Sequence, residues 1–164
     1  MDPFFQWLYE SPVGVAIREN GLLFPWIESV HVLSITLVVG TIGIVDLRLL
    51  GLASRNRAIS RMSDEILPVT WTAFGFAALT GVLLFTSNAL KYAHNPFFLA
   101  KMCLLVLAFF NMLLFNLITS RGIERWDESP NVPGAVRFAG AASLALWIAV
   151  IVTGRWIGFT MSPF

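Results

Sequence analysis

Residues 29–45 read SVHVLSITLVVGTIGIV, and this stretch decides the class of fold because it holds no aspartate, glutamate, lysine or arginine. Three further stretches lack these charges as well: residues 66–90, 102–120 and 138–154. A helix needs about 20 mainly apolar residues to cross the hydrocarbon core of a bilayer. Each stretch is therefore a candidate membrane-spanning segment.

The composition agrees with this interpretation, since the chain of 164 residues is 57% hydrophobic and only 13% charged. Such a chain has too few polar side chains to cover a soluble globule and is typical of an integral membrane protein. Its apolar runs are continuous rather than alternating, which favours helices over a β-barrel. The sequence predicts an all-α membrane protein, a four-helix bundle forming one domain over residues 1–164. The approximate spans are 24–50, 66–90, 97–120 and 135–158.

The segment before the first span, residues 2–21, mixes apolar and polar side chains and is broken at Ser11 and Pro12. Such a pattern is typical of amphipathic helices that lie in the membrane interface. Residues 1–9 carry Asp2 and no basic residue, so they do not look like a cleavable signal. We therefore expect the first membrane helix to be retained.

The distribution of lysine and arginine predicts the orientation. Seven arginines lie on one side of the spans: Arg48, Arg55, Arg57, Arg61, Arg121, Arg125 and Arg137. The other side holds four cations: Arg18, Lys91, Lys101 and Arg155. The positive-inside rule places the first set in the cytoplasm, so both termini should face outward. Trp26 and Trp156 would then mark the outer interface, and Trp71 and Trp126 the inner one.

Several function classes are disfavoured. The net charge is +1 and the arginines alternate with acidic residues, which argues against binding of nucleic acid. The sequence has no glycine-rich phosphate loop, so nucleotide binding is not expected. The single cysteine, Cys103, cannot form an intrachain disulfide. We expect membrane lipid as a partner, and an exposed face of small residues would favour a homo-oligomer.

The chain has two histidines, His31 and His94, and both are predicted near the outer side. Two imidazoles from a four-helix bundle can hold a b-type haem between them. Further residues on the same side could pair with the propionates or form walls for the ring: Lys91, Lys101, Arg155, Trp26, Phe97, Phe98 and Trp156. No histidine lies near the inner ends, so we expect a single haem that exchanges electrons with a periplasmic protein and a membrane quinone.

Other interpretations of these residues remain open. Glu28 and His31 lie three residues apart and could reach one metal ion, although Glu28 also suits the start of a helix. Copper could use imidazole or sulfur ligands such as Met102 or Cys103. Both histidines could instead hydrogen bond to carbonyl groups or water. The alternatives to a haem protein are therefore binding or transport of copper or another small solute, or a structural subunit without a cofactor.

Two polar residues within the spans are expected to stabilise the bundle. Asp46 lies at the inner boundary of the first span, where an unpaired carboxylate is costly, so we expect an arginine partner. Asn111 is the deepest strongly polar residue of the third span and should hydrogen bond to a neighbouring helix.

The motifs FPWIESVHVL at 24–33 and DLRLLG at 46–51, with Gly40 between them, resemble those of a family of small bacterial inner-membrane proteins of unknown function. The likeness continues through NPFF at 95–98, Lys101 and residues 111–115, so it covers nearly the whole chain. This group is distantly similar to the membrane domain of copper-resistance D proteins and to four-helix b-type cytochromes. The near resemblance implies a fold and a location in the bacterial inner membrane. The distant one implies a haem or copper role centred on His31.

Overall fold

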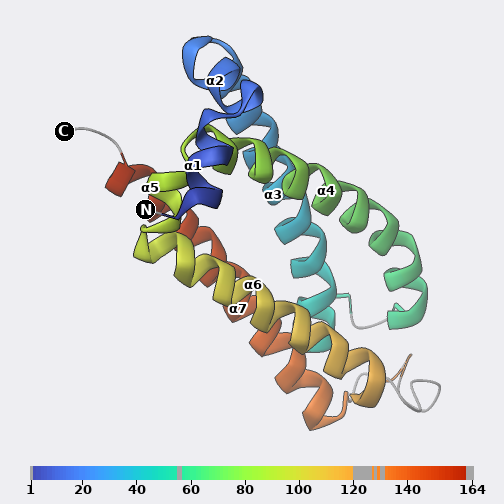
Figure 1. Ribbon diagram of the computed structural model, residues 1–164. Coiled ribbons are helices and arrows are strands. Elements are labelled where there is room, and N and C mark those ends of the chain that lie inside the picture. Colours follow the sequence, from blue (N-terminus) through green and yellow to red (C-terminus); the bar gives the residue numbers. More distant parts are fainter. Residues whose placement is uncertain (1, 55–56, 120–126, 128, 130–131, 162–164) are drawn as a thin grey trace.

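The computed structural model describes residues 2–54, 57–119, 127, 129 and 132–161, and these residues contain helices but no strand (Figure 1). The four long helices are α3 (Leu23–Leu49), α4 (Ile59–Ser87), α6 (Pro96–Leu114) and α7 (Gly134–Met161). All four are long and apolar enough to cross a membrane, with α6 extended to Leu117 by the π-helical turn η1 (Phe115–Thr119). The predicted all-α, four-span membrane fold is therefore confirmed.

The long helices form two antiparallel pairs. α3 packs along α4, α6 packs along α7, and contacts between α3 and α7 join the pairs. Three short helices lie at one end of the bundle: α1 (Pro3–Glu10), α2 (Pro12–Glu19) and α5 (Ala89–Ala93). We call this end the α5 end, and Figure 1 shows the start of α1 and the end of α7 beside it. The opposite end, which joins α3 to α4 and α6 to α7, is called the loop end.

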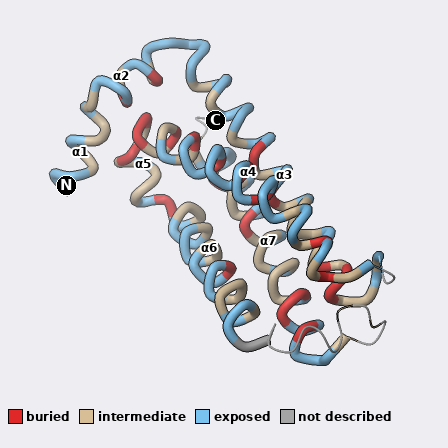
Figure 2. The backbone as a smooth tube through the Cα atoms, turned by 90° about the vertical axis from the view of Figure 1, so that its right-hand side faces the viewer, coloured by how far each residue is buried: buried red, intermediate tan, exposed pale blue. Residues whose placement is uncertain are grey.

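The exterior of the bundle is apolar, as a lipid solvent requires. Large side chains such as Val82, Phe110 and Ile148 are exposed, whereas small ones such as Ala73 and Ala77 are buried on α4. Figure 2 shows buried positions along the inward sides of the helices and exposed positions outside. Because lipid gives no hydrophobic force between helices, close packing of small residues contributes much of their association.

The spans differ from the predicted ranges mainly at the start of α4, which begins at Ile59 rather than near residue 66. Charged residues such as Arg61 and Asp64 lower the hydropathy of this first part, so the helix begins before the apolar stretch on which the prediction rested. The helix is nevertheless anchored here, since Ile59 and Met62 are each 1% exposed. Asp127 also accepts hydrogen bonds from the Ser60 backbone N–H and hydroxyl, and so caps the start of α4.

Arg48 holds the loop end together. Its side chain is fully buried, and it donates from Nε to the Arg57 carbonyl at 2.9 Å and from Nη2 to the Asp127 carbonyl at 3.1 Å. The Ser129 carbonyl lies 3.5 Å from Nη2. Arg48 thus binds backbone carbonyls in the loop between α3 and α4 and in the loop between α6 and α7. Arg55, Arg121, Arg125 and Trp126, which supported the predicted orientation, lie outside the described residues.

The same contacts change the pKa of the Asp127 carboxyl. Its partial burial alone would raise the pKa of the carboxyl, but the hydrogen bonds from Ser60 and Ile59 and the charge of Arg48 outweigh that effect. The pKa of Asp127 therefore lies below its usual value, and the carboxylate is the form that caps α4.

Among the described residues, Asp46 has no arginine partner of the kind that was expected. Asp46 is buried, Ser143 of α7 is its hydrogen-bonding neighbour, and Oδ2 has no partner within the described ranges. Residues two apart on a helix point to nearly opposite sides, so Arg48 reaches the loops while Asp46 faces α7. The expectation for Asn111 is confirmed, because its Nδ2 donates to the Ala139 carbonyl of α7 at 3.1 Å.

The helices α1 and α2 dock on the α5 end of α4. Arg18 donates to the Ser87 carbonyl at 2.8 Å and lies over the Tyr9 ring. A side chain at Gly14 would meet the Thr86 carbonyl at 2.9 Å, so glycine permits this close contact. Docking leaves Phe4 and Trp7 of α1 exposed, as expected for a helix that meets a membrane interface.

Candidate functional site

His31 lies half-buried on α3, about two turns from the start of the helix. Its Nδ1 is 3.0 Å from the Thr80 hydroxyl of α4, and that hydroxyl donates to the Phe76 carbonyl at 2.6 Å. With the Thr80 proton on the Phe76 carbonyl, Nδ1 of His31 would be the donor to Thr80. The neutral ring then carries its lone pair on Nε2. Imidazoles that ligate metals in proteins are usually oriented by such a bond from the other nitrogen.

Gly81 sets the distance between the His31 ring and α4. A Cβ atom at this position would lie 3.1 Å from Cε1 of His31 and 3.7 Å from Nδ1. Most Cβ contacts are longer, so a side chain here would push the ring away. Thr80 and Gly81 together define where the imidazole lies.

Lys101 approaches the same region from α6. Its side chain passes over Gly154 of α7, where a Cβ atom would lie 3.7 Å from Nζ. The charge of Lys101 is near enough to act on the His31 ring. Within the part of the chain that the structure describes, the only salt bridge joins Arg57 and Glu65, so Lys101 has no carboxylate partner there. An ammonium group between membrane helices without such a partner is costly and marks a candidate site.

Aromatic rings close the α5 end above these residues. Phe85 of α4 stacks on Phe98 of α6 with centroids 5.3 Å apart, and Tyr92 of α5 lies 6.1 Å from Phe85 and 5.5 Å from Phe98. Burial raises the pKa of the Tyr92 phenol, and the Glu28 carboxylate raises it further. The tyrosine therefore keeps its proton and can act as a hydrogen-bond donor near Glu28.

The second histidine is placed differently. His94 is exposed at the end of α5, and its Nδ1 donates to the Leu90 carbonyl at 2.8 Å. It follows Tyr92 by two residues, which puts the two side chains on nearly opposite faces of the helix. Since Tyr92 contacts Phe85 and Phe98, His94 is directed away from that cluster.

The other predicted site residues lie on the outside of the bundle. Trp26 is 69% exposed. Trp156 is 50% exposed and contacts Phe97 and Phe159, and Arg155 lies over the Phe159 ring. Glu28 is exposed, although its charge acts on Tyr92. Of the predicted set, the structure brings Phe97 against Trp156 and places the charge of Lys101 near the His31 ring.

Sequence reasoning did not identify Thr80 and Gly81 as neighbours of His31. One signal could have found them, because Thr80 lies seven residues before the end of α4 and His31 eight residues after the start of α3. In antiparallel helices these positions have similar depths. The described residues hold no group of three histidine, cysteine, aspartate or glutamate side chains that could bind a metal ion.

Comparisons with known proteins give one match. No curated protein and no solved structure matches the chain. A family model described as a family of unknown function, DUF6644, matches residues 4–160. This range includes α2 to α6 in full and all but one terminal residue of α1 and of α7. The chain therefore belongs to the DUF6644 family.

Proposed function

We propose that this protein binds one haem b between its four helices near the α5 end and serves in electron transfer. His31 would ligate the iron through Nε2, and the Lys101 ammonium would pair with a propionate. Haem supplies reversible one-electron chemistry when it is bound.

The relation between His31 and Lys101 carries this proposal. A ligand that satisfies both must accept a lone pair from Nε2 and present an anion to Nζ, and haem b offers an iron atom and two carboxylates. The orientation of His31 by Thr80 and the missing carboxylate partner of Lys101 support the assignment.

We assign His31 as the only histidine ligand. His94 was expected to take the opposite side of the iron, but its direction on α5 argues against that role. The opposite coordination position would then be open to an added ligand. This differs from a haem held by two histidines, and spectroscopy separates the two cases.

The location belongs to the same proposal. The arginines around the loop end favour the cytoplasmic side of a bacterial inner membrane, so the α5 end would face the periplasm. The haem would then lie near the periplasmic surface and exchange electrons with a periplasmic redox protein and with membrane quinone.

The test is an absorption spectrum of the full chain, expressed with ample haem and purified in detergent. We expect a Soret band, a shift on reduction with dithionite, and a further shift when carbon monoxide is added. His31→Ala should lose most of the haem, whereas His94→Ala should keep it. Lys101→Met should retain less haem than Lys101→Arg, because the arginine keeps the charge.

Three results would contradict this assignment. A featureless visible spectrum would remove haem from consideration. Retention of haem by His31→Ala would exclude His31 as the ligand. Loss of low-spin bands in His94→Ala, with no carbon monoxide shift in the wild type, would restore ligation by two histidines.

A second candidate is a site for a small anionic solute between His31 and Lys101. It is favoured by the outward positions of Trp26, Trp156 and Arg155, which leave these residues unavailable to enclose a macrocycle. Copper is the further alternative at His31, and metal analysis of the same preparation tests it. Calorimetric titration with acetate and phosphate tests the anion site, and Lys101→Met should abolish such binding.

A further inference from the structure

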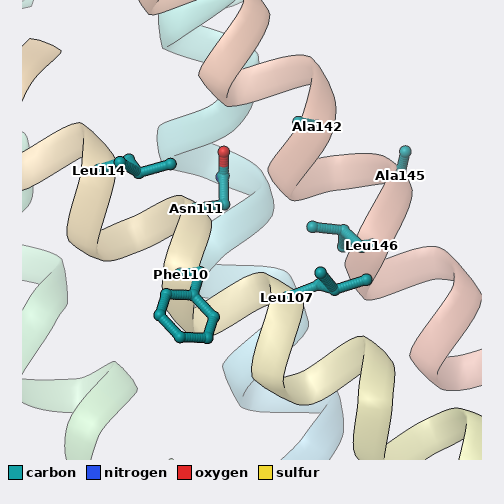
Figure 3. A pocket seen from close by; sticks show the side chains of 7 residues that line it. All are labelled: Leu107, Phe110, Asn111, Leu114, Ala142, Ala145 and Leu146. Atoms are coloured by element: carbon teal, nitrogen blue, oxygen red, sulfur yellow. The ribbon is translucent and has the colours of Figure 1, made fainter.

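A groove of about 470 Å³ lies between α6 and α7, and His31 does not line it (Figure 3). Six of its seven lining residues are apolar, and four of these, Leu107, Phe110, Leu114 and Ala145, are exposed on the outside of the bundle. The groove therefore opens toward lipid. Its volume falls in the range of about 300–1,000 Å³ typical of small-molecule sites, which are mostly apolar with a few polar groups.

Asn111 is the single polar side chain in the groove. Figure 3 shows it between Leu114 and Phe110 on α6, with the small residues Ala142 and Ala145 on the neighbouring α7. Its Nδ2 donates one hydrogen bond to the Ala139 carbonyl at 3.1 Å. A carboxamide has two N–H groups and an acceptor oxygen, so hydrogen-bonding capacity remains for a ligand.

The depth of Asn111 limits the class of ligand. Asn111 precedes the end of the α6 span at Leu117 by six residues, or about 9 Å along a helix. The ester groups of phospholipids lie at the membrane interface, outside the hydrocarbon core. A ligand whose oxygen reaches Asn111 must therefore carry a polar group that can enter the hydrocarbon region.

We infer that the groove binds the ring of a lipid-soluble quinone, with a ring oxygen hydrogen bonded to Asn111. A quinone ring has carbonyl oxygens on a flat apolar body, and its prenyl tail can remain in the lipid. Ala142 and Ala145 leave space where larger residues would fill the groove. The inference relies on the proposed function only for the role of quinone as an electron partner, since binding itself does not require haem.

The test is saturable binding of decylubiquinone to the full chain in lipid nanodiscs, measured by quenching of tryptophan fluorescence. Ala145→Phe should weaken binding by about tenfold or more, because the ring would occupy the groove. Ala141→Phe is the matched control, since Ala141 is also exposed on α7 but does not line the groove. Asn111→Leu should also weaken binding, and circular dichroism checks that this variant is folded.

The outcomes separate this inference from other occupants and from the haem proposal. No saturable binding in the wild type, or equal binding by Ala145→Phe and Ala141→Phe, would overturn it. A wild-type oligomer that Ala145→Phe converts to a monomer would identify the groove as an interface between copies. Haem content is measured separately. Quinone binding by protein without haem would contradict the proposed function and still support the groove as a quinone site.

Discussion

Position 81 shows how one missing side chain controls the candidate site. The His31 ring lies where a Cβ atom of residue 81 would come within 3.1 Å, while Thr80 fixes the orientation of the same ring. The imidazole is therefore held between a hydrogen bond and a steric limit. Small changes at Gly81 should move it more than larger changes on the lipid face of α4.

We predict that Gly81→Val displaces the His31 ring and lowers haem retention. The crowding should also reduce the free energy of unfolding by about 1–3 kcal/mol. Gly75→Val is the control on the same helix, because a Cβ there meets nothing within 4 Å. Haem content and thermal unfolding should be measured for both variants. Equal effects of the two substitutions would show that they reflect the general cost of replacing a glycine in α4, and not displacement of the His31 ring.

At the scale of elements, α4 depends on a residue from a distant loop. Its start at Ile59 has no capping side chain from its own N-cap residue, Ala58, and Asp127 supplies that cap across the loop end. The two helix pairs are thus linked through a helix terminus as well as through the contacts of α3 with α7. A local defect in one loop should weaken the other pair.

We predict that Asp127→Ala lowers the free energy of unfolding by about 1 kcal/mol at neutral pH, as loss of an N-cap usually does. The pKa of Asp127 is lower in the folded chain than its usual 3.8, so its charge stabilises the fold above that value. This stabilisation is lost as the pH falls through the folded pKa. The difference between wild type and Asp127→Ala should therefore shrink in acid.

Unfolding curves measured at several pH values test this prediction. The control is Asp64→Ala, because Asp64 is exposed on α4 and makes no salt bridge in the described residues. A difference between wild type and Asp127→Ala that is constant from neutral pH to pH values well below 3.8 would show that the carboxylate is not the stabilising form.

At the scale of the whole molecule, one end holds the start of α1, the end of α7 and the short helices α2 and α5. The described arginines Arg48, Arg57, Arg61 and Arg137 lie near the other end. We predict that a membrane-impermeant maleimide labels Glu10→Cys in intact cells. Asp64→Cys should be labelled only after the membrane is permeabilised. Both variants should carry Cys103→Ser to remove the native thiol. Labelling in the reverse order would invert the proposed orientation.

The sequence predicted the four spans well because a helix surrounded by lipid needs apolar side chains, which raise the hydropathy of the sequence. It did not predict features that depend on contacts between helices. The start of α4 is capped by Asp127, and among the described residues Asp46 has Ser143 rather than an arginine as its neighbour. At the site, the positions of His31 and Lys101 along their spans suggested that both lie near the same side of the membrane. The direction of His94 depends on the rotation of α5, which composition does not determine.

The position of Arg48 bears on how the protein is made. Its side chain is synthesised with the first span, whereas two of its carbonyl partners, those of Asp127 and Ser129, follow it by 79 and 81 residues. During translation the guanidinium therefore emerges long before these acceptors exist. Full burial of Arg48 must wait for the third span and the loop that follows it. Completion of the loop end is thus a late event in biogenesis, and a nascent chain that stops before residue 127 carries an arginine without its final partners.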